Sequence, residues 1–129
     1  GGDVRGRKVG LLGLTFKPNT DDMRDAPSLA IVQALIDGGA EVAAYDPEGM
    51  EVAQALMPEI SYLPDPYAVA EGAVAVVIVT EWDAFRALDL KRLGDTMDKR
   101  CLVDLRNIYQ PEEAKRAGFD YHSVGRPAA

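Results

Sequence analysis

The sequence predicts an α/β protein with a Rossmann-like, doubly wound parallel sheet of about six strands and helices on both faces. Short apolar runs alternate with segments of helical periodicity along the 129 residues, which is typical of such a sheet. Residues 73–80 (AVAVVIVT) are apolar on both faces, as a central parallel strand should be. The expected strand order is 3-2-1-4-5-6, which places the first and fourth strands side by side at the topological switch point.

Six strands are expected, each an apolar run bounded by turn-forming residues. They cover residues 8–16, 41–45, 60–63, 73–80, 102–105 and 119–123. In the first run, Gly10 and Gly13 lack the third glycine of a dinucleotide fingerprint, so we expect them to permit close packing. Asp46 ends the second strand, where a dinucleotide domain holds a ribose-binding acid. Without the fingerprint, we expect Asp46 to cap the turn before Pro47.

Helices are expected between these strands. The first has Asp25 or Ser28 as its N-cap and Pro27 in its first turn, and Gly38 and Gly39 end it. Its apolar stripe at helical spacing comprises Leu29, Val32, Leu35 and Ile36. Further helices are expected over residues 50–56, 67–71, 83–93 and 111–117.

Length and composition indicate one globular domain, with residues 1–6 as a linker remnant and residues 7–129 as the folded unit. The net charge of −7 argues against a nucleic-acid or anionic-membrane surface. No apolar run approaches the ~20 residues of a membrane span. The first residues include no initiator Met and do not resemble a signal peptide, so we expect a trimmed, cytoplasmic protein.

The sequence contains one cysteine, Cys101, and one histidine, His122. A single cysteine forms no internal disulfide, which fits a reducing cytoplasm. We expect Cys101 to be a small buried hydrophobe at the start of the fifth strand, because nothing in the sequence indicates a lowered thiol pKa. His122 lies in the expected edge strand, and no neighbour in the sequence gives it a metal-ligand spacing. No metal site is therefore expected.

Charged and aromatic residues gather where three strands end. They are Phe16 and Lys17 at the carboxyl end of the first strand, Glu81 and Trp82 at that of the fourth, and Asp104 and Arg106 at that of the fifth. The carboxyl ends of parallel strands meet at one edge of the sheet, where open α/β sheets bind ligands. Cations among turn N–H groups suit a phosphate; the alternative is that they pair with neighbouring aspartates. Asp104 is expected to bond to the backbone or to Arg106 rather than to act as a catalytic acid.

Four segments, in this order, carry a family resemblance. They are TFKPNTDDMRDAPS (15–28), VTEWDAF (79–85), VDLRN (103–107) and SVGR (123–126). From about residue 7 to residue 126, the chain resembles the C-terminal, UDP-binding domain of the UDP-glucose/GDP-mannose dehydrogenase family. Glu81 and Trp82 match the second motif, and we expect them either to line the mouth of the crevice or to pack the switch point.

The resemblance also implies roles for four residues. In the family, the residues that match Phe16, Lys17 and Arg106 contact the UDP-sugar. The match to Arg24 implies contact with the cofactor NAD, which is bound mainly by a separate N-terminal Rossmann domain. Each has a structural alternative: Phe16 as a core aromatic, and the cations as ion-pair partners of nearby aspartates.

The resemblance finally implies what the complete enzyme does. In the UDP-glucose branch, which the first segment resembles most, the C6 alcohol of UDP-glucose is oxidised to a carboxylate with two NAD and a water, through a cysteine nucleophile. That cysteine, and the long helix that pairs the subunits of a homodimer, belong to other regions, so this chain alone is expected to be inactive. The alternatives are the same domain from a GDP-mannose or UDP-N-acetylamino-sugar dehydrogenase, and a non-enzymatic Rossmann-like nucleotide-binding module.

Overall fold

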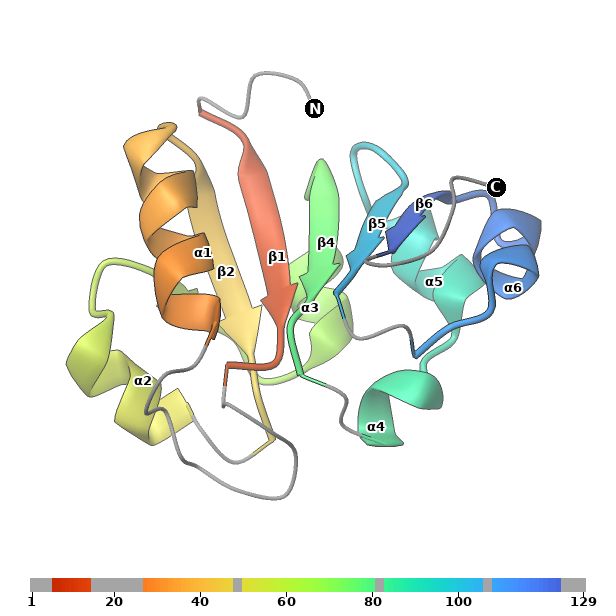
Figure 1. The fold of residues 1–129 in the computed structure, drawn as a ribbon. Helices are drawn as coiled ribbons and strands as arrows, with labels where there is room; N and C mark the ends of the chain where they lie inside the picture. Colours follow the sequence, from red (N-terminus) through yellow and green to blue (C-terminus); the bar gives the residue numbers. More distant parts are fainter. Residues whose placement is uncertain (1–5, 15–26, 48–49, 81–82, 106–107, 124–129) are drawn as a thin grey trace.

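Six parallel strands form the centre of the molecule. The computed structural model describes residues 6–14, 27–47, 50–80, 83–105 and 108–123 (Figure 1). The strands are β1 (Lys8–Leu12), β2 (Glu41–Tyr45), β3 (Ser61–Tyr62), β4 (Ala75–Ile78), β5 (Cys101–Asp104) and β6 (Asp120–Ser123). They pair in the order β3-β2-β1-β4-β5-β6, all parallel. The predicted fold class and strand order are therefore confirmed, although β1 ends earlier than expected, at Leu12.

Helices connect the strands. They are α1 (Pro27–Asp37), α2 (Met50–Leu56), α3 (Pro66–Ala70), α4 (Asp83–Arg86), α5 (Leu90–Asp95) and α6 (Pro111–Arg116). The single helix expected over residues 83–93 was wrong, because the chain forms α4 and α5 instead. Asp89 has an extended backbone, and its side chain accepts the N–H of Arg92 at 3.2 Å, so it begins a new helix. None of the helices that the structure describes is long and apolar enough to cross a membrane.

Backbone pairing aligns the carboxyl ends of the central strands. In the register of the sheet, Leu12 lies opposite Tyr45 on one side and opposite Ile78 on the other. Ile78 in turn lies opposite Asp104. The arrowheads of β1, β4 and β5 accordingly point to the same edge (Figure 1). This is the edge at which we predicted the ligand crevice.

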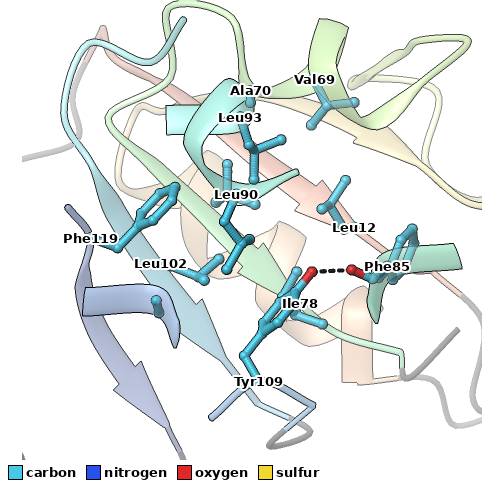
Figure 2. Close-up of a cluster of buried hydrophobic side chains, with 12 residues drawn as sticks. Leu12, Val69, Ala70, Ile78, Phe85, Leu90, Leu93, Leu102, Tyr109 and Phe119 are labelled. Atoms are coloured by element: carbon cyan, nitrogen blue, oxygen red, sulfur yellow. Dashed lines mark hydrogen bonds between the residues drawn. The ribbon is translucent and has the colours of Figure 1, made fainter. Parts of the chain in front are cut away.

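The sheet divides the core into two apolar clusters, because successive strand residues point to opposite faces. Leu11 belongs to the cluster beneath α1 and α2, whereas Leu12 belongs to the cluster beneath α3, α4, α5 and α6. Figure 2 shows the second cluster, in which Phe85 and Tyr109 lie beside Ile78. Helices on both faces explain why the central strands are apolar throughout.

Gly10 permits the close approach of α3 to β1. A Cβ at this position would lie 2.6 Å from Val69 Cγ1 and 3.0 Å from the Val69 carbonyl oxygen. At the start of the same strand, the Lys8 ammonium donates to the carbonyl oxygens of Ala68 (3.1 Å) and Glu71 (2.6 Å), at the carboxyl end of α3. The expectation that Gly10 permits close packing is confirmed.

We predict that Gly10→Ala lowers the free energy of unfolding by about 1–3 kcal/mol, because the new methyl group overpacks against Val69. Adding Val69→Ala removes the nearest clashing atom. The double variant should therefore lose at least about 0.5 kcal/mol less stability than the sum of the two single variants. Urea denaturation of the four proteins measures this coupling. Strictly additive losses would contradict the packing role of Gly10.

Candidate functional site

The candidate site lies at the carboxyl ends of β1, β4 and β5. The residues predicted to bind the ligand, which are Phe16, Lys17, Arg24, Glu81, Trp82 and Arg106, lie outside the described residues. The structure does describe the residues that precede three of these segments: Leu14, Thr80 and Leu105. The backbone at these three points therefore defines the geometry of the site.

The ends of β1 and β4 are in direct contact at Gly13 and Thr80. Gly13 has a φ of 96°, in the region that favours glycine. A Cβ on Gly13 would lie 2.6 Å from both the backbone nitrogen and the Cβ of Thr80, which is fully buried. The N–H of Val79 also donates to the carbonyl oxygen of Leu12 at 2.9 Å. The last described residues before the segments that begin at residues 15 and 81 therefore lie at adjoining points of the sheet.

Asp46 holds the end of β1 from the other side. It is fully buried, and its Oδ2 accepts the N–H of Leu14 at 2.7 Å. The N–H of Gly13 donates to the carbonyl oxygen of Tyr45 at 2.8 Å. We expected Asp46 to cap the turn before Pro47; the structure shows it bridging from β2 to Leu14, which precedes the first predicted ligand-binding segment. Sequence reasoning missed this contact because it joins residues 32 positions apart.

Asp104 organises the end of β5 in a similar way. Its Oδ2 accepts the N–H of Tyr109 at 3.0 Å and the hydroxyl of Tyr121 at 2.8 Å. The Tyr109 hydroxyl donates to the carbonyl oxygen of Phe85 (Figure 2). Burial, followed by the charge of Asp104, raises the pKa of Tyr109. These bonds fix the positions of Asp104 and Tyr109, which lie before and after Arg106 in the sequence. The expectation that Asp104 bonds to the backbone is therefore confirmed.

The described residues do not fit a dinucleotide cofactor. In a dinucleotide-binding fold, a glycine-rich turn leads directly from the first strand to a helix N-terminus that binds the pyrophosphate. Here the sequence that follows β1 has Gly13 but no further glycine before Pro27, so it lacks the glycine-rich turn. Gly10 and Gly13 are closed off by Val69 and Thr80, and Asp46, in the position of a ribose-binding acid, is buried against the backbone. This part of the chain therefore offers no cradle for NAD.

A surface pocket of about 250 Å³ lies elsewhere, over β2 and β3. It is lined by Lys8, Glu41, Val42, Ala43, Ser61 and Leu63. No residue of β4 or β5 lines it, and the Lys8 ammonium already binds the carboxyl end of α3. Because a phosphate would have to compete with those carbonyl oxygens for Lys8, the pocket is a poor nucleotide site.

Cys101 is half-buried rather than fully buried as we expected. Its partner in the register is Asp120, an exposed residue of the edge strand β6, so one side of the thiol faces the surface. Burial, followed by the charge of Asp120, raises the pKa of the thiol above its ordinary value. Cys101 also begins β5, at the opposite end of the strand from Asp104. It is therefore neither activated nor close to the candidate site.

Comparisons with known proteins agree with this geometry. Residues 10–111 match the family model described as the UDP-glucose/GDP-mannose dehydrogenase family, UDP binding domain. The chain is 59% identical to the UDP-glucose 6-dehydrogenase of Rhizobium meliloti, over 98% of this chain and 29% of that protein. It is 41% identical to UDP-glucose 6-dehydrogenase TuaD of Bacillus subtilis, over 98% of this chain and 28% of that protein. The chain thus spans less than a third of the length of these relatives.

Solved structures of nucleotide-sugar dehydrogenases share the fold of this chain. A UDP-glucose dehydrogenase from Pyrobaculum islandicum aligns with a TM-score of 0.78 and 35% identity, over 97% of this chain and 27% of that one. An NDP-N-acetyl-D-galactosaminuronic acid dehydrogenase from Methanosarcina mazei Go1 aligns with a TM-score of 0.86 and 27% identity, over 99% of this chain and 26% of that one. The fold is therefore shared by dehydrogenases that act on different nucleotide sugars.

We predict that Asp104→Ala lowers the free energy of unfolding by about 1–3 kcal/mol, because the buried N–H of Tyr109 loses its acceptor. Asp98→Ala is the matched control, because the Asp98 carboxylate is exposed and, among the described residues, pairs with the exposed Arg7 side chain at 3.4 Å. Its loss should change stability by no more than about 0.5 kcal/mol. Urea denaturation measures both. Equal effects of the two substitutions would contradict the anchoring role of Asp104.

Proposed function

Because the chain belongs to the UDP-glucose/GDP-mannose dehydrogenase family, as its UDP-binding domain, we propose that it forms the nucleotide-sugar wall of an NAD-dependent UDP-glucose 6-dehydrogenase. One observation carries the proposal: the carboxyl ends of β1, β4 and β5 lie at the same edge of the sheet. In the sequence, each of these ends is followed by a segment that bears predicted ligand-binding residues. The contact between Gly13 and Thr80 and the anchors at Asp46 and Asp104 hold these ends in place.

The proposed division of roles follows the chemistry of the side chains. Lys17 and Arg106 bind the diphosphate, since an ammonium supplies a mobile point charge and a guanidinium can bind two oxygens at once. Phe16 lies against the bound substrate, and Glu81 and Trp82 line the mouth of the crevice. These residues orient UDP-glucose and carry no proton transfer.

In this proposal, residues of the remaining polypeptide catalyse the oxidation of the sugar. When bound there, NAD accepts a hydride in each of two oxidation steps, which convert the C6 alcohol to a carboxylate. Cys101 is at the amino-terminal end of β5, whereas the substrate is bound at the carboxyl-terminal edge, so the nucleophile must come from elsewhere. Arg24 is the residue of this chain that reaches toward the cofactor. A homodimer of the complete protein, located in the cytoplasm, is part of the same proposal.

Sequence identity supports UDP-glucose as the proposed substrate. Two relatives named as UDP-glucose 6-dehydrogenases are 59% and 41% identical to this chain. The Methanosarcina enzyme, which is named for a different NDP-sugar, aligns with a higher TM-score than the Pyrobaculum enzyme. It is, however, only 27% identical to this chain. A domain from a GDP-mannose or UDP-N-acetylamino-sugar dehydrogenase therefore remains the second candidate, on the ground that the fold is common to all of them.

We predict that Arg106→Ala in the complete protein weakens UDP binding by about 10- to 150-fold. This corresponds to the loss of a charge-assisted hydrogen bond, about 1.5–3 kcal/mol. Arg116→Ala is the matched control, because Arg116 is exposed in the last turn of α6, and it should leave the dissociation constant unchanged. Calorimetry with UDP measures both. An unchanged affinity in Arg106→Ala, with the fold intact, would remove Arg106 from the site.

A further inference from the structure

Three side chains of different chemistry meet on the edge strand β6 and its neighbour β5. In the register of the sheet, Cys101 lies opposite Asp120 and Val103 lies opposite His122. Alternate residues of a strand share a face, so Cys101, Asp120 and His122 project from the same face of the sheet. The Cys101 Sγ, a carboxylate oxygen of Asp120 and a ring nitrogen of His122 all lie within 4.8 Å of one another.

The cluster is both ordered and accessible. His122 Nε2 lies 3.1 Å from Asp120 Oδ2, and their side chains are 57% and 74% exposed. Cys101 is half-buried, and the N–H of Asp120 donates to the carbonyl oxygen of Arg100 at 2.8 Å, which fixes the start of β6 beside that of β5. Two ladder positions on the same face of the sheet therefore hold three candidate ligand residues, of which two are exposed and one is half-buried.

We propose that Cys101, Asp120 and His122 form a binding site for one thiophilic divalent cation, of which Zn²⁺ is the best match. Zinc binds cysteine sulfur, histidine nitrogen and carboxylate oxygen at about 2.0–2.3 Å, so ligands around one tetrahedral ion are separated by roughly 3–4 Å. The pair Asp120 and His122 already has such a separation. The Cys101 Sγ lies within 4.8 Å of both atoms and supplies the third ligand, and water takes the fourth position.

A nucleophilic thiol assisted by His122 is the rival interpretation, and the electrostatics disfavour it. Burial and the charge of Asp120 raise the pKa of the Cys101 thiol, whereas an activated cysteine needs a lowered pKa. A bound cation reverses this effect, because its charge stabilises the thiolate. Asp120 therefore opposes a free thiolate but supports a metal-bound one.

The proposed site is separate from the nucleotide-sugar site. Cys101 and Asp120 begin β5 and β6, whereas the nucleotide-sugar site lies at the opposite, carboxyl-terminal edge. The spacing of residues along the chain did not reveal the cluster, because Cys101 and Asp120 become neighbours only through the pairing of β5 with β6.

Cobalt titration of the reduced 129-residue chain tests the site. Because Cys101 is the only cysteine, any thiolate-to-cobalt charge-transfer band reports on it alone. We expect one Co²⁺ per chain, visible-region bands of tetrahedral cobalt, and loss of these bands on addition of Zn²⁺. Asp120→Asn and His122→Gln should each weaken cobalt binding at least about tenfold, because each removes one ligand. Asp98→Asn, at an exposed carboxylate outside the cluster, should leave binding unchanged.

Three results would overturn the proposal, provided that circular dichroism shows each variant folded. The first is binding that Asp120→Asn and His122→Gln leave unaltered, which would mean that the thiol alone holds the ion. The second is one Co²⁺ per two chains, which would mean that thiols of two molecules share it. The third is the absence of a thiolate-to-cobalt band in the unaltered chain.

Discussion

The contact between the ends of β1 and β4, at Gly13 and Thr80, is the constraint on which the site depends. Gly13 is required there for two reasons: its φ is 96°, and a Cβ would lie 2.6 Å from the backbone of Thr80. Because no side chain separates the strands at this contact, the last described residues before two of the predicted binding segments lie at adjoining points of the sheet. One of these segments carries Phe16 and Lys17, and the other carries Glu81 and Trp82. In a doubly wound sheet, ligands usually bind at the carboxyl ends of two such neighbouring strands.

Two buried carboxylates extend this constraint to the neighbouring strands. Asp46 at the end of β2 binds the backbone of Leu14, and Asp104 at the end of β5 binds the backbone of Tyr109. Neither is placed to react with a ligand, since both are fully buried. Their effect is to position the residues that flank the predicted binding segments. The domain thus separates the groups that hold the edge of the sheet from the groups proposed to bind the substrate.

The architecture could be predicted from the sequence because it depends on local patterns, whereas the missed features depend on distant contacts. The two-faced apolar run before Thr80 correctly indicated a central parallel strand. The break between α4 and α5 was missed because the apolar spacing continues across Asp89, whose capping bond to Arg92 is visible only in the structure. The bridge from Asp46 to Leu14, and the cluster around Cys101, require the register of the sheet. The roles of Lys17 and Arg106 rest on the family resemblance.

The central claim is that UDP binds at the carboxyl ends of β1, β4 and β5. A titration of the isotope-labelled 129-residue chain with UDP, followed through its backbone amide resonances, tests this most directly. We predict saturable shifts at Leu14, Thr80 and Leu105, with an affinity lower than that of a complete cleft, because a single wall buries only part of the ligand. Shifts confined to the pocket over β2 and β3, at residues such as Lys8 and Ser61, would contradict the account, as would no saturable shift at the three strand ends.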